Sequence, residues 1–434
     1  MESINKIRSM PFPKQETYSI NEINALNRFL LCGNPLSIYR GNWGPAFMGG
    51  EKVKKIEREW SDYMGGCHSL AVNSCTSALI IACGAIGLQP GDEVIVTPWS
   101  MSCSATAPMW WGAIPVFADI SRNTFCLEPE SIKQVITDKT KAIIIVDLFG
   151  HPFDVEAIQK IASDHGLFII EDAAQSPGAD WKDSGGKFQK TGLLGDIGCF
   201  SFTWGKHLTC GEGGMITTTD EILKDKCALI RNHAEAVLHG MARNDSAQYE
   251  RATYSNMKNA VGMNTRMTEL NAIILSEQLK KLDERVMARQ QNVDKINNLL
   301  RDIPFIKIPE VQKNYSHANY VQPFLYDSEK AGGVHRDVFL KLAIDQLVGE
   351  EGRPDRPMIS GGYIEPLYRF PLFQKNMHYS IKNTDYTKIH LPVVEKLWRD
   401  DFFLSMYHNL PLLKNDIKEI SDAFHFAADK VTSL

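Results

Sequence analysis

Short apolar runs alternate with helical patterns between about residues 75 and 220. Apolar positions with helical spacing over residues 76 to 87 and 154 to 165 predict amphipathic helices that connect strands. The predicted strands are EVIVTP at 93 to 98, IPVFADI at 114 to 120, AIIIVDLFG at 142 to 150, FIIED at 168 to 172, IGCFSF at 197 to 202 and GMITTTD at 214 to 220. This alternation of strands and helices predicts an α/β fold with a mostly parallel sheet covered by helices.

The hydrophobic period becomes helical from Arg266 to about Asp302, which predicts one long helix. The remainder mixes short strands such as YVQPFLYD, a Gly/Pro-rich stretch at about 348 to 372 and a terminal helix from Lys414 onward. We therefore predict a large α/β domain with an N-terminal segment over residues 1–265. A bridging helix and a smaller C-terminal α+β domain are predicted over residues 266–434.

The composition favours a soluble globular protein over a membrane, nucleic-acid-binding or disulfide-rich protein. The 434 residues are 44% hydrophobic and carry 47 Lys+Arg against 52 Asp+Glu, a net charge of −5, which is typical of a soluble globular protein. There is no signal-peptide core, no apolar run of about 18 residues and no basic block, so we expect neither a membrane span nor nucleic-acid binding. The nine cysteines form no C-x-x-C pair, so we expect no disulfide framework, no metal site and a reducing, cytoplasmic location.

Two stretches of the large domain carry candidate chemistry. VNSCTSAL, at 72 to 79, places small hydroxyl residues at a helix start, where N–H groups can bind an anion, although an ordinary N-cap explains the same residues. FIIEDAAQ, at 168 to 175, is an apolar strand that ends on an acidic pair, and ligands bind at the carboxyl ends of parallel strands. Asp172 is therefore either a partner for a protonated heterocyclic nitrogen or a helix N-cap.

A third stretch, GDIGCFSFTWGKHLTCGEGG at 195 to 214, places Lys206 four residues after a strand end and before a Gly-rich turn. A partly desolvated lysine can form a Schiff base with an aldehyde, whereas most lysines are solvated surface residues. A fourth stretch, GMNTRMTELNA at 262 to 272, opens the predicted long helix with polar residues.

In this order the stretches resemble the DegT/DnrJ/EryC1/StrS family of sugar aminotransferases, which depend on pyridoxal 5′-phosphate (PLP) and have the type I fold. The resemblance extends over nearly the whole chain. Its motifs are Gly49-Gly50 followed by Val53, Glu57 and Trp60, S-C-T-S-A-L in place of the usual S-G-T-x-A-L, E-D-x-A-Q, G-D-I-G-x-F-S-F-x-x-x-K with its G-E-G-G tail, and G-x-N-x-R-M-T-E.

The resemblance implies a role for each matching residue. Lys206 would form the Schiff base and then shuttle protons, while Asp172 would pair with the pyridine nitrogen so that the ring acts as an electron sink. Gln175 would lie beside the ring oxygen. The phosphate would be held by Ser74, Cys75, Thr76, Ser201 and, from the neighbouring subunit, Asn264. This makes a homodimer with a shared active site part of the expectation. Substrate contacts are expected from His207, His317, Tyr320 and Tyr363.

The sequence departs from the family pattern at two positions. Met101 stands where an aromatic residue usually stacks on the cofactor ring, and a thioether can pack on such a face. Trp99 either reaches the ring instead or lies in the core. Cys75 replaces a glycine in the phosphate turn, and we expect a buried structural thiol there.

The reaction implied is amino transfer from L-glutamate or L-glutamine to a nucleotide-linked 3- or 4-keto sugar. A free keto-cyclitol of the scyllo-inosose type is the alternative acceptor. A related branch of 3-dehydratases has His at the Schiff-base position, so Lys206 favours transamination over dehydration. A regulator that binds PLP without turnover also stays open, but the complete set of Lys206, Asp172 and the phosphate residues favours catalysis.

Overall fold

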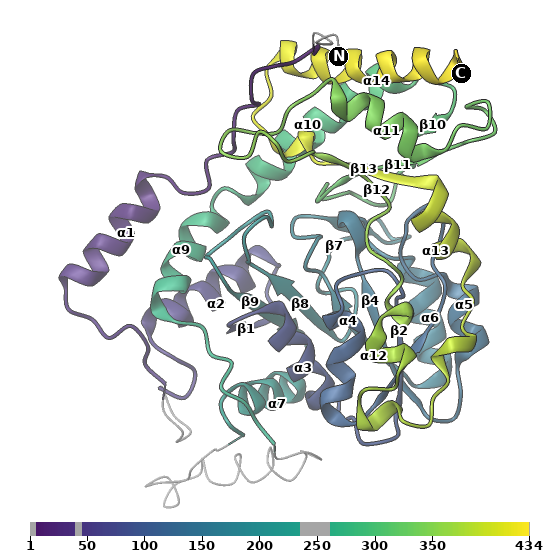
Figure 1. The fold of residues 1–434 in the computed structure, drawn as a ribbon. Helices are drawn as coiled ribbons and strands as arrows, with labels where there is room; N and C mark the ends of the chain where they lie inside the picture. The colour runs from purple at the N-terminus through teal and green to yellow at the C-terminus, as the bar shows by residue number, and fades with distance from the viewer. Residues whose placement is uncertain (1–5, 40–45, 235–260, 434) are drawn as a thin grey trace, which may run out of the picture.

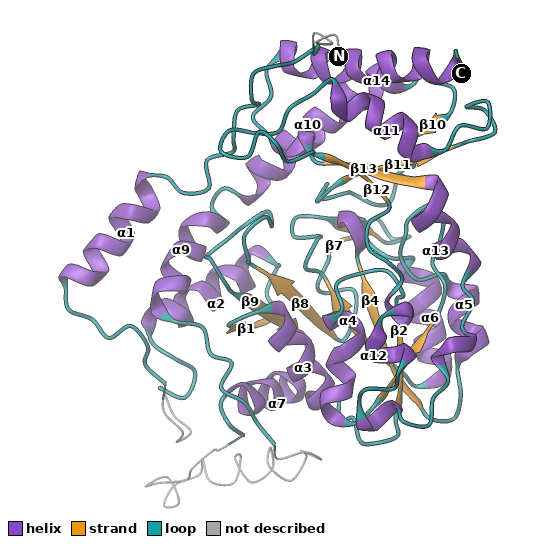
Figure 2. Cartoon of the chain, in the orientation of Figure 1, coloured by secondary structure: helices purple, strands orange, loops and turns teal. Residues whose placement is uncertain are grey.

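The computed structural model describes residues 6–39, 46–234 and 261–433 of the chain. It contains a seven-stranded sheet, a four-stranded sheet and a two-stranded hairpin of β6 (Asp180–Lys182) and β7 (Phe188–Lys190). Helices lie against both larger sheets (Figures 1 and 2). The predicted α/β fold with a mostly parallel central sheet is confirmed.

In the large sheet only β9 runs against its neighbours, β8 and β1, while all other adjacent pairs are parallel. The six predicted strands are present, each within a few residues of its predicted ends. The strand β1 was not predicted, because its apolar run is short. The spatial order is β1 (His68–Val72), β9 (Gly214–Thr218), β8 (Ile197–Ser201), β5 (Phe168–Asp172), β4 (Thr140–Val146), β2 (Glu93–Val96) and β3 (Ile114–Phe117).

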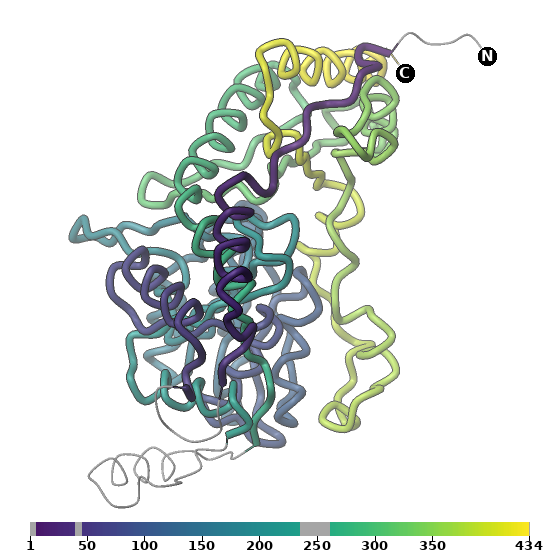
Figure 3. Tube along the Cα trace, turned by 90° about the vertical axis from the view of Figure 1, so that its left-hand side faces the viewer, coloured from purple at the N-terminus to yellow at the C-terminus, as the bar shows by residue number. Residues whose placement is uncertain are grey.

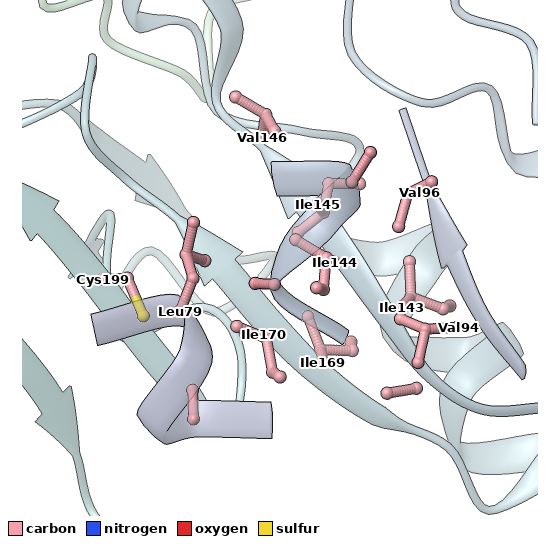
Figure 4. Close-up of a cluster of buried hydrophobic side chains, with 14 of the residues drawn as sticks. Leu79, Val94, Val96, Ile143, Ile144, Ile145, Val146, Ile169, Ile170 and Cys199 are labelled. Carbon is pink, nitrogen blue, oxygen red and sulfur yellow. The ribbon is translucent and has the colours of Figure 1, made fainter. Parts of the chain in front are cut away.

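Both faces of the large sheet are buried. Ile143, Ile144 and Ile145 follow one another in β4 and are all fully buried, although successive side chains of a strand point to opposite faces. Figure 4 shows them packed among apolar side chains of β2 and β5. The helices around the sheet are α2 (Glu51–Tyr63), α3 (Cys75–Ala85), α4 (Cys103–Thr106), α5 (Pro129–Val135), α6 (Val155–His165) and α7 (Glu221–Arg231).

The two predicted connecting helices are α3 and α6. Each begins at a polar N-cap residue, Ser74 for α3 and Asp154 for α6, whose side chain accepts a hydrogen bond from a first-turn N–H. The helix α6 ends at Gly166, whose φ of 63° lies in the left-handed region that glycine adopts readily.

The predicted single helix over residues 266 to 302 is wrong, because the structure has two helices, α9 (Glu269–Leu279) and α10 (Leu282–Leu300). The helical path breaks at Lys281, which has φ −106° and ψ 0°. On either side of the break the partners differ: α9 packs against α1 (Ile20–Leu31) and α2, whereas α10 packs against α14 (Lys414–Thr432). Because of this break, α9 and α10 pack against different parts of the molecule.

The four-stranded sheet is antiparallel and packs against α11 (Arg336–Asp345) and α14. Its core is aromatic, with the rings of Phe324 and Phe403 stacked at a centroid distance of 4.9 Å. The strand order is β10 (Ile306–Lys307), β11 (Gln322–Tyr326), β13 (Phe402–Ser405) and β12 (Ile359–Gly361).

Two segments that are far apart in the sequence connect the layers around the two larger sheets. Near the N-terminus, Arg8 forms an ion pair with Asp416 of α14, and the chain then runs along the molecule to α1 (Figure 3). After β12, the chain returns to the large sheet through α12 (Pro371–Gln374) and α13 (Pro392–Lys396), where Tyr386 Oη donates to the Pro115 carbonyl at 2.7 Å. The domain division at residue 265 stays a prediction. None of the helices in the described ranges is both long and apolar enough to cross a bilayer.

A buried ion pair joins α2, β1 and α7. Arg231 is fully buried and donates to Glu57 Oε1 at 2.7 Å and to the Ala71 carbonyl at 2.9 Å. The same carboxylate oxygen accepts the Ala71 N–H at 2.9 Å. Each charge is therefore compensated only while its partner is present.

Replacing Glu57 by Ala should lower the free energy of unfolding by about 3–5 kcal/mol, because it leaves the Arg231 charge buried without its partner. Urea denaturation of the variant and the wild type measures this. The matched control is Glu130→Ala, which removes a well-exposed carboxylate paired with Lys133 and should change stability by less than about 1 kcal/mol. Equal, small effects of both substitutions would contradict the importance of the buried pair.

Candidate active site

The structure brings the predicted chemical residues together at one edge of the large sheet. Asp172 ends β5, Ser201 ends β8, and Cys75 begins α3 just after β1. Cys75 Sγ lies 3.7 Å from Asp172 Oδ1. Gly214 of β9 lies directly against the start of α3, where a Cβ would stand only 2.6 Å from the carbonyl carbon of Ser74. A glycine here is what lets β9 approach the start of α3.

Asp172 is a buried carboxylate with neutral hydrogen-bond donors. Ser104 Oγ donates to Oδ2 at 2.7 Å and the Ala174 N–H donates to Oδ1 at 3.2 Å. Burial raises the pKa of Asp172, while these donors and the nearby charge of Lys206 oppose the rise. In the described part of the chain, no Lys, Arg or His side chain forms an ion pair with it. The carboxylate therefore complements a cationic ligand.

Lys206 follows β8 at the end of a short turn and is half-buried. Its Nζ lies 4.2 Å from the centre of the Tyr320 ring. The residue lines a cavity of about 490 Å³, bounded by residues 14–17, by α10 and by residues 350–353. A small molecule in this cavity would lie beside Lys206.

Gln175 is oriented by a strained residue. The Phe149 N–H donates to Gln175 Oε1 at 2.8 Å, so the amide NH₂ faces the Tyr363 hydroxyl, 3.5 Å away. Phe149 has φ 62°, which is unusual for a bulky residue, and its carbonyl accepts the Tyr320 N–H at 2.9 Å. Gln175 thus offers N–H donors to a ligand, and the same backbone unit anchors Tyr320.

The start of α3 provides hydroxyl and N–H groups. Ser74 caps the helix by accepting the Ser77 N–H at 3.1 Å, and Thr76 is exposed beside it. Ser201 is buried at the end of β8. Burial raises the pKa of the Cys75 thiol well above its usual value, so the thiol is neutral. This end of the helix can accept an anion.

Two predicted substrate residues hold the segment that carries Tyr320. His207 is buried, with Nε2 2.7 Å from the Ala318 carbonyl oxygen, and burial lowers its pKa well below the usual value. His317 Nδ1 accepts the Asn319 N–H at 2.8 Å. These contacts describe their place in the fold; the roles of His207, His317, Tyr320 and Tyr363 toward a substrate stay predictions.

The structure separates Trp99 from Met101. Trp99 is fully buried in an aromatic cluster that includes Phe402, and its Nε1 donates to the Ile364 carbonyl at 2.7 Å. Of the two alternatives for Trp99, the core position is the one observed. Met101 is 56% exposed, which leaves its thioether accessible, and its contact with a cofactor ring stays a prediction.

Asn264 lies on the surface of the single chain. Arg266 Nε donates to its Oδ1 at 2.8 Å, which leaves the amide NH₂ as a donor. The adjacent Thr265 is buried and tied to Arg231 through its N–H and hydroxyl, so the position of the segment is fixed by the core.

Several site residues were not predicted from the sequence. Ser104 bonds to Asp172 across 68 positions of the chain, and His408 Nε2 lies 2.8 Å from the Asn319 carbonyl oxygen. The hydroxyl-rich run SMSCS at 100 to 104 was the one available signal for Ser104. Nothing in the sequence marks Phe149 for a positive φ.

The assembled groups suit one kind of ligand. A buried carboxylate complements a protonated ring nitrogen, an amine reacts with an aldehyde, and a helix N-terminus binds a phosphate. PLP carries all three groups. In the described residues, no cluster of three or more His, Cys, Asp or Glu could hold a metal ion.

The sequence profile of the DegT/DnrJ/EryC1/StrS aminotransferase family matches residues 37–423. The chain is 30% identical to the L-glutamine:2-deoxy-scyllo-inosose aminotransferase of Streptoalloteichus tenebrarius, over 96% of this chain and 94% of that protein. It is 39% identical to the GDP-perosamine synthase of Caulobacter vibrioides, over 56% of this chain and 60% of that protein. An aminotransferase from Psychrobacter cryohalolentis superimposes with a TM-score of 0.78 at 28% identity, covering 95% and 98% of the two chains. The chain therefore belongs to the DegT/DnrJ/EryC1/StrS family of PLP-dependent sugar aminotransferases.

Proposed function

We propose that this enzyme transfers the amino group of L-glutamate or L-glutamine to the ketone of a sugar, with Lys206 and Asp172 as its catalytic residues. The observation that carries the proposal is the meeting of a lysine, a buried carboxylate and a helix N-terminus at one sheet edge. Two neighbouring strands and the turn before α3 supply these groups.

Each residue of this set has a part in holding the cofactor. Bound PLP supplies an aldehyde and an electron-withdrawing ring. Asp172 would pair with the ring nitrogen, and Gln175 would donate to the ring oxygen. Ser74, the Cys75 backbone, Thr76 and Ser201 would bind the phosphate, and Met101 would pack on the ring.

Lys206 has two tasks in this proposal. Its amine would hold the cofactor covalently through the aldehyde, and as a free amine it would take and return a proton at the substrate carbon. In this proposal the substrate enters through the cavity that Lys206 lines, and the Tyr320 ring, 4.2 Å from Nζ, lies beside the reacting amine. The presence of Lys at this position favours transamination over 3-dehydration.

We infer that the acceptor is a nucleotide-linked 3- or 4-keto sugar. The identity to a GDP-perosamine synthase supports this acceptor class. A free keto-cyclitol is the second candidate, because the scyllo-inosose aminotransferase aligns with this chain nearly end to end. All nine cysteines are unpaired in the structure, which supports a reducing compartment, and we propose the cytoplasm.

Visible absorbance of the purified protein with PLP tests the proposed function. Glutamate or glutamine should bleach the absorbance of the bound aldehyde form, and the correct keto acceptor should restore it. A panel of nucleotide-linked keto sugars and keto-cyclitols distinguishes the acceptors. A deoxygenated sugar as the main product would overturn the aminotransferase proposal, and absence of any response to amino acids would favour a regulator.

Lys206→Ala should reduce turnover by at least about 10⁴-fold, because proton transfer alone commonly contributes 10²–10⁴ and covalent attachment is lost as well. Steady-state amino transfer measures the loss, and circular dichroism checks the fold. Lys190→Ala, which removes a lysine paired with Asp180 at the hairpin, is the matched control and should keep normal turnover. Near-normal transfer by Lys206→Ala would remove Lys206 from its role.

We also propose a homodimer in which Asn264 of one subunit reaches the phosphate bound by the other, since its free amide donor lies on the surface. Mixing Lys206→Ala with Asn264→Asp subunits should then restore about one quarter of the wild-type activity. Half of the dimers would be mixed, and each would have one intact site. Product formation after subunit exchange measures this. No recovery in dimers that demonstrably exchange would contradict the shared site, because each site would then carry one defect.

A further inference from the structure

A chain of two buried hydroxyls leads to the carboxylate of Asp172. Ser104 lies in α4, the short helix after β2, and is fully buried. Its Oγ is 2.7 Å from Asp172 Oδ2. Behind it, Ser100 is also buried, and the two serine Oγ atoms are 3.3 Å apart.

The chemistry of the groups sets the direction of these bonds. An ionised carboxylate can only accept, so the Ser104 hydroxyl donates a hydrogen bond to Asp172, and the Ser104 oxygen is then free to accept one from Ser100. A hydroxyl that donates to a carboxylate forms a short, charge-assisted bond, and the second hydroxyl polarises the first.

The two oxygens of Asp172 are held by different elements. Cys75 Sγ and the Ala174 N–H approach Oδ1, at 3.7 Å and 3.2 Å. Among the residues that the structure describes, Ser104 is the donor found at Oδ2. Burial raises the pKa of Asp172, while the Ser104 bond, the nearby charge of Lys206, the Ala174 N–H and the Cys75 thiol oppose the rise. Loss of this one hydroxyl therefore affects both the orientation of the carboxylate and its charge.

We propose that Ser104 is a positioning residue that keeps Asp172 ionised and in a fixed orientation, with Ser100 supporting it from behind. Pairing with a cationic ring nitrogen requires both properties. The inference rests on the proposed function, because it assumes that Asp172 meets the ring nitrogen of PLP.

The test compares the affinity of the full-length apoprotein for PLP and for an analogue with carbon in place of the ring nitrogen, across a range of pH. Only the ionised form of Asp172 forms an ion pair with a protonated ring nitrogen, so acidification should weaken binding of PLP more than binding of the analogue. A group with a raised pKa is protonated at a higher pH. Loss of the Ser104 hydroxyl raises the pKa of Asp172 further. In Ser104→Ala the affinity for PLP should therefore begin to fall, relative to the affinity for the analogue, at a pH at least about one unit higher than in the wild type.

Matched variants separate this role from a general structural effect. Ser102→Ala removes an exposed hydroxyl two positions away and should leave the profile unchanged. Ser104→Thr keeps a hydroxyl and should restore the wild-type profile. If Ser104→Ala does not fold, Ser100→Ala should give a smaller shift in the same direction.

Two results would overturn the inference, and they are distinguishable. Coincident profiles of PLP and the analogue in the wild type would show that Asp172 does not pair with the ring nitrogen, so the assigned role of Asp172 in the proposed function would fail. A clear difference between the two ligands in the wild type, with Ser104→Ala and Ser100→Ala both unshifted, would reject only the positioning role of Ser104.

Discussion

Parallel pairing of β5 with β8 holds side by side the strand end that carries Asp172 and the strand end that precedes Lys206. The register places Asp172 opposite Cys199, two residues before β8 ends at Ser201. Lys206 follows five residues after the end of β8, and its charge lies near the Asp172 carboxylate. Because both strands are buried in the middle of the sheet, neither end can shift without disturbing the apolar core. The positions of the lysine and the carboxylate thus depend on the same packing that stabilises the fold.

Glu171, the residue before Asp172 in β5, has a structural contact of its own. Side chains alternate along β5, so Glu171 points away from Asp172. Its carboxylate accepts the backbone N–H groups of Gly192, Leu194 and Gly195, in the loop that leads into β8. One acidic side chain of the pair therefore fixes the course of the chain before β8, and the other lies in the candidate site. A one-residue slip of the strand would exchange these two environments, because successive side chains point to opposite faces.

Burial also explains why polar groups around the site need so many partners. A carboxylate removed from water is costly unless hydrogen bonds or a cation compensate it. Asp172 has three neutral donors, and a cationic ligand would complete its surroundings. The strained backbone of Phe149 is held in the same way, by Gln175 on one side and Tyr320 on the other. Such strain persists only where neighbouring bonds determine the conformation.

Local patterns in the sequence were sufficient for six of the seven strands of the large sheet and for α3 and α6, because apolar runs and polar caps act over a few residues. The break between α9 and α10 was not predictable, since apolar residues keep a helical spacing through Lys280 and Lys281 while the packing partners change. The positions of Lys206 and Asp172 followed from motif order. The Ser104 contact did not, because it joins segments that only the folded sheet brings together.

The role proposed for Lys206 is tested most directly by finding the residue to which PLP becomes covalently attached. The protein is incubated with PLP, reduced with borohydride, digested and examined by mass spectrometry, with a parallel sample in which excess L-glutamine is added before reduction. We expect a pyridoxyl adduct on the peptide that contains Lys206, and we expect its loss in the sample treated with the amino donor. An adduct confined to a different lysine, or one at Lys206 that no amino donor can displace, would contradict this role.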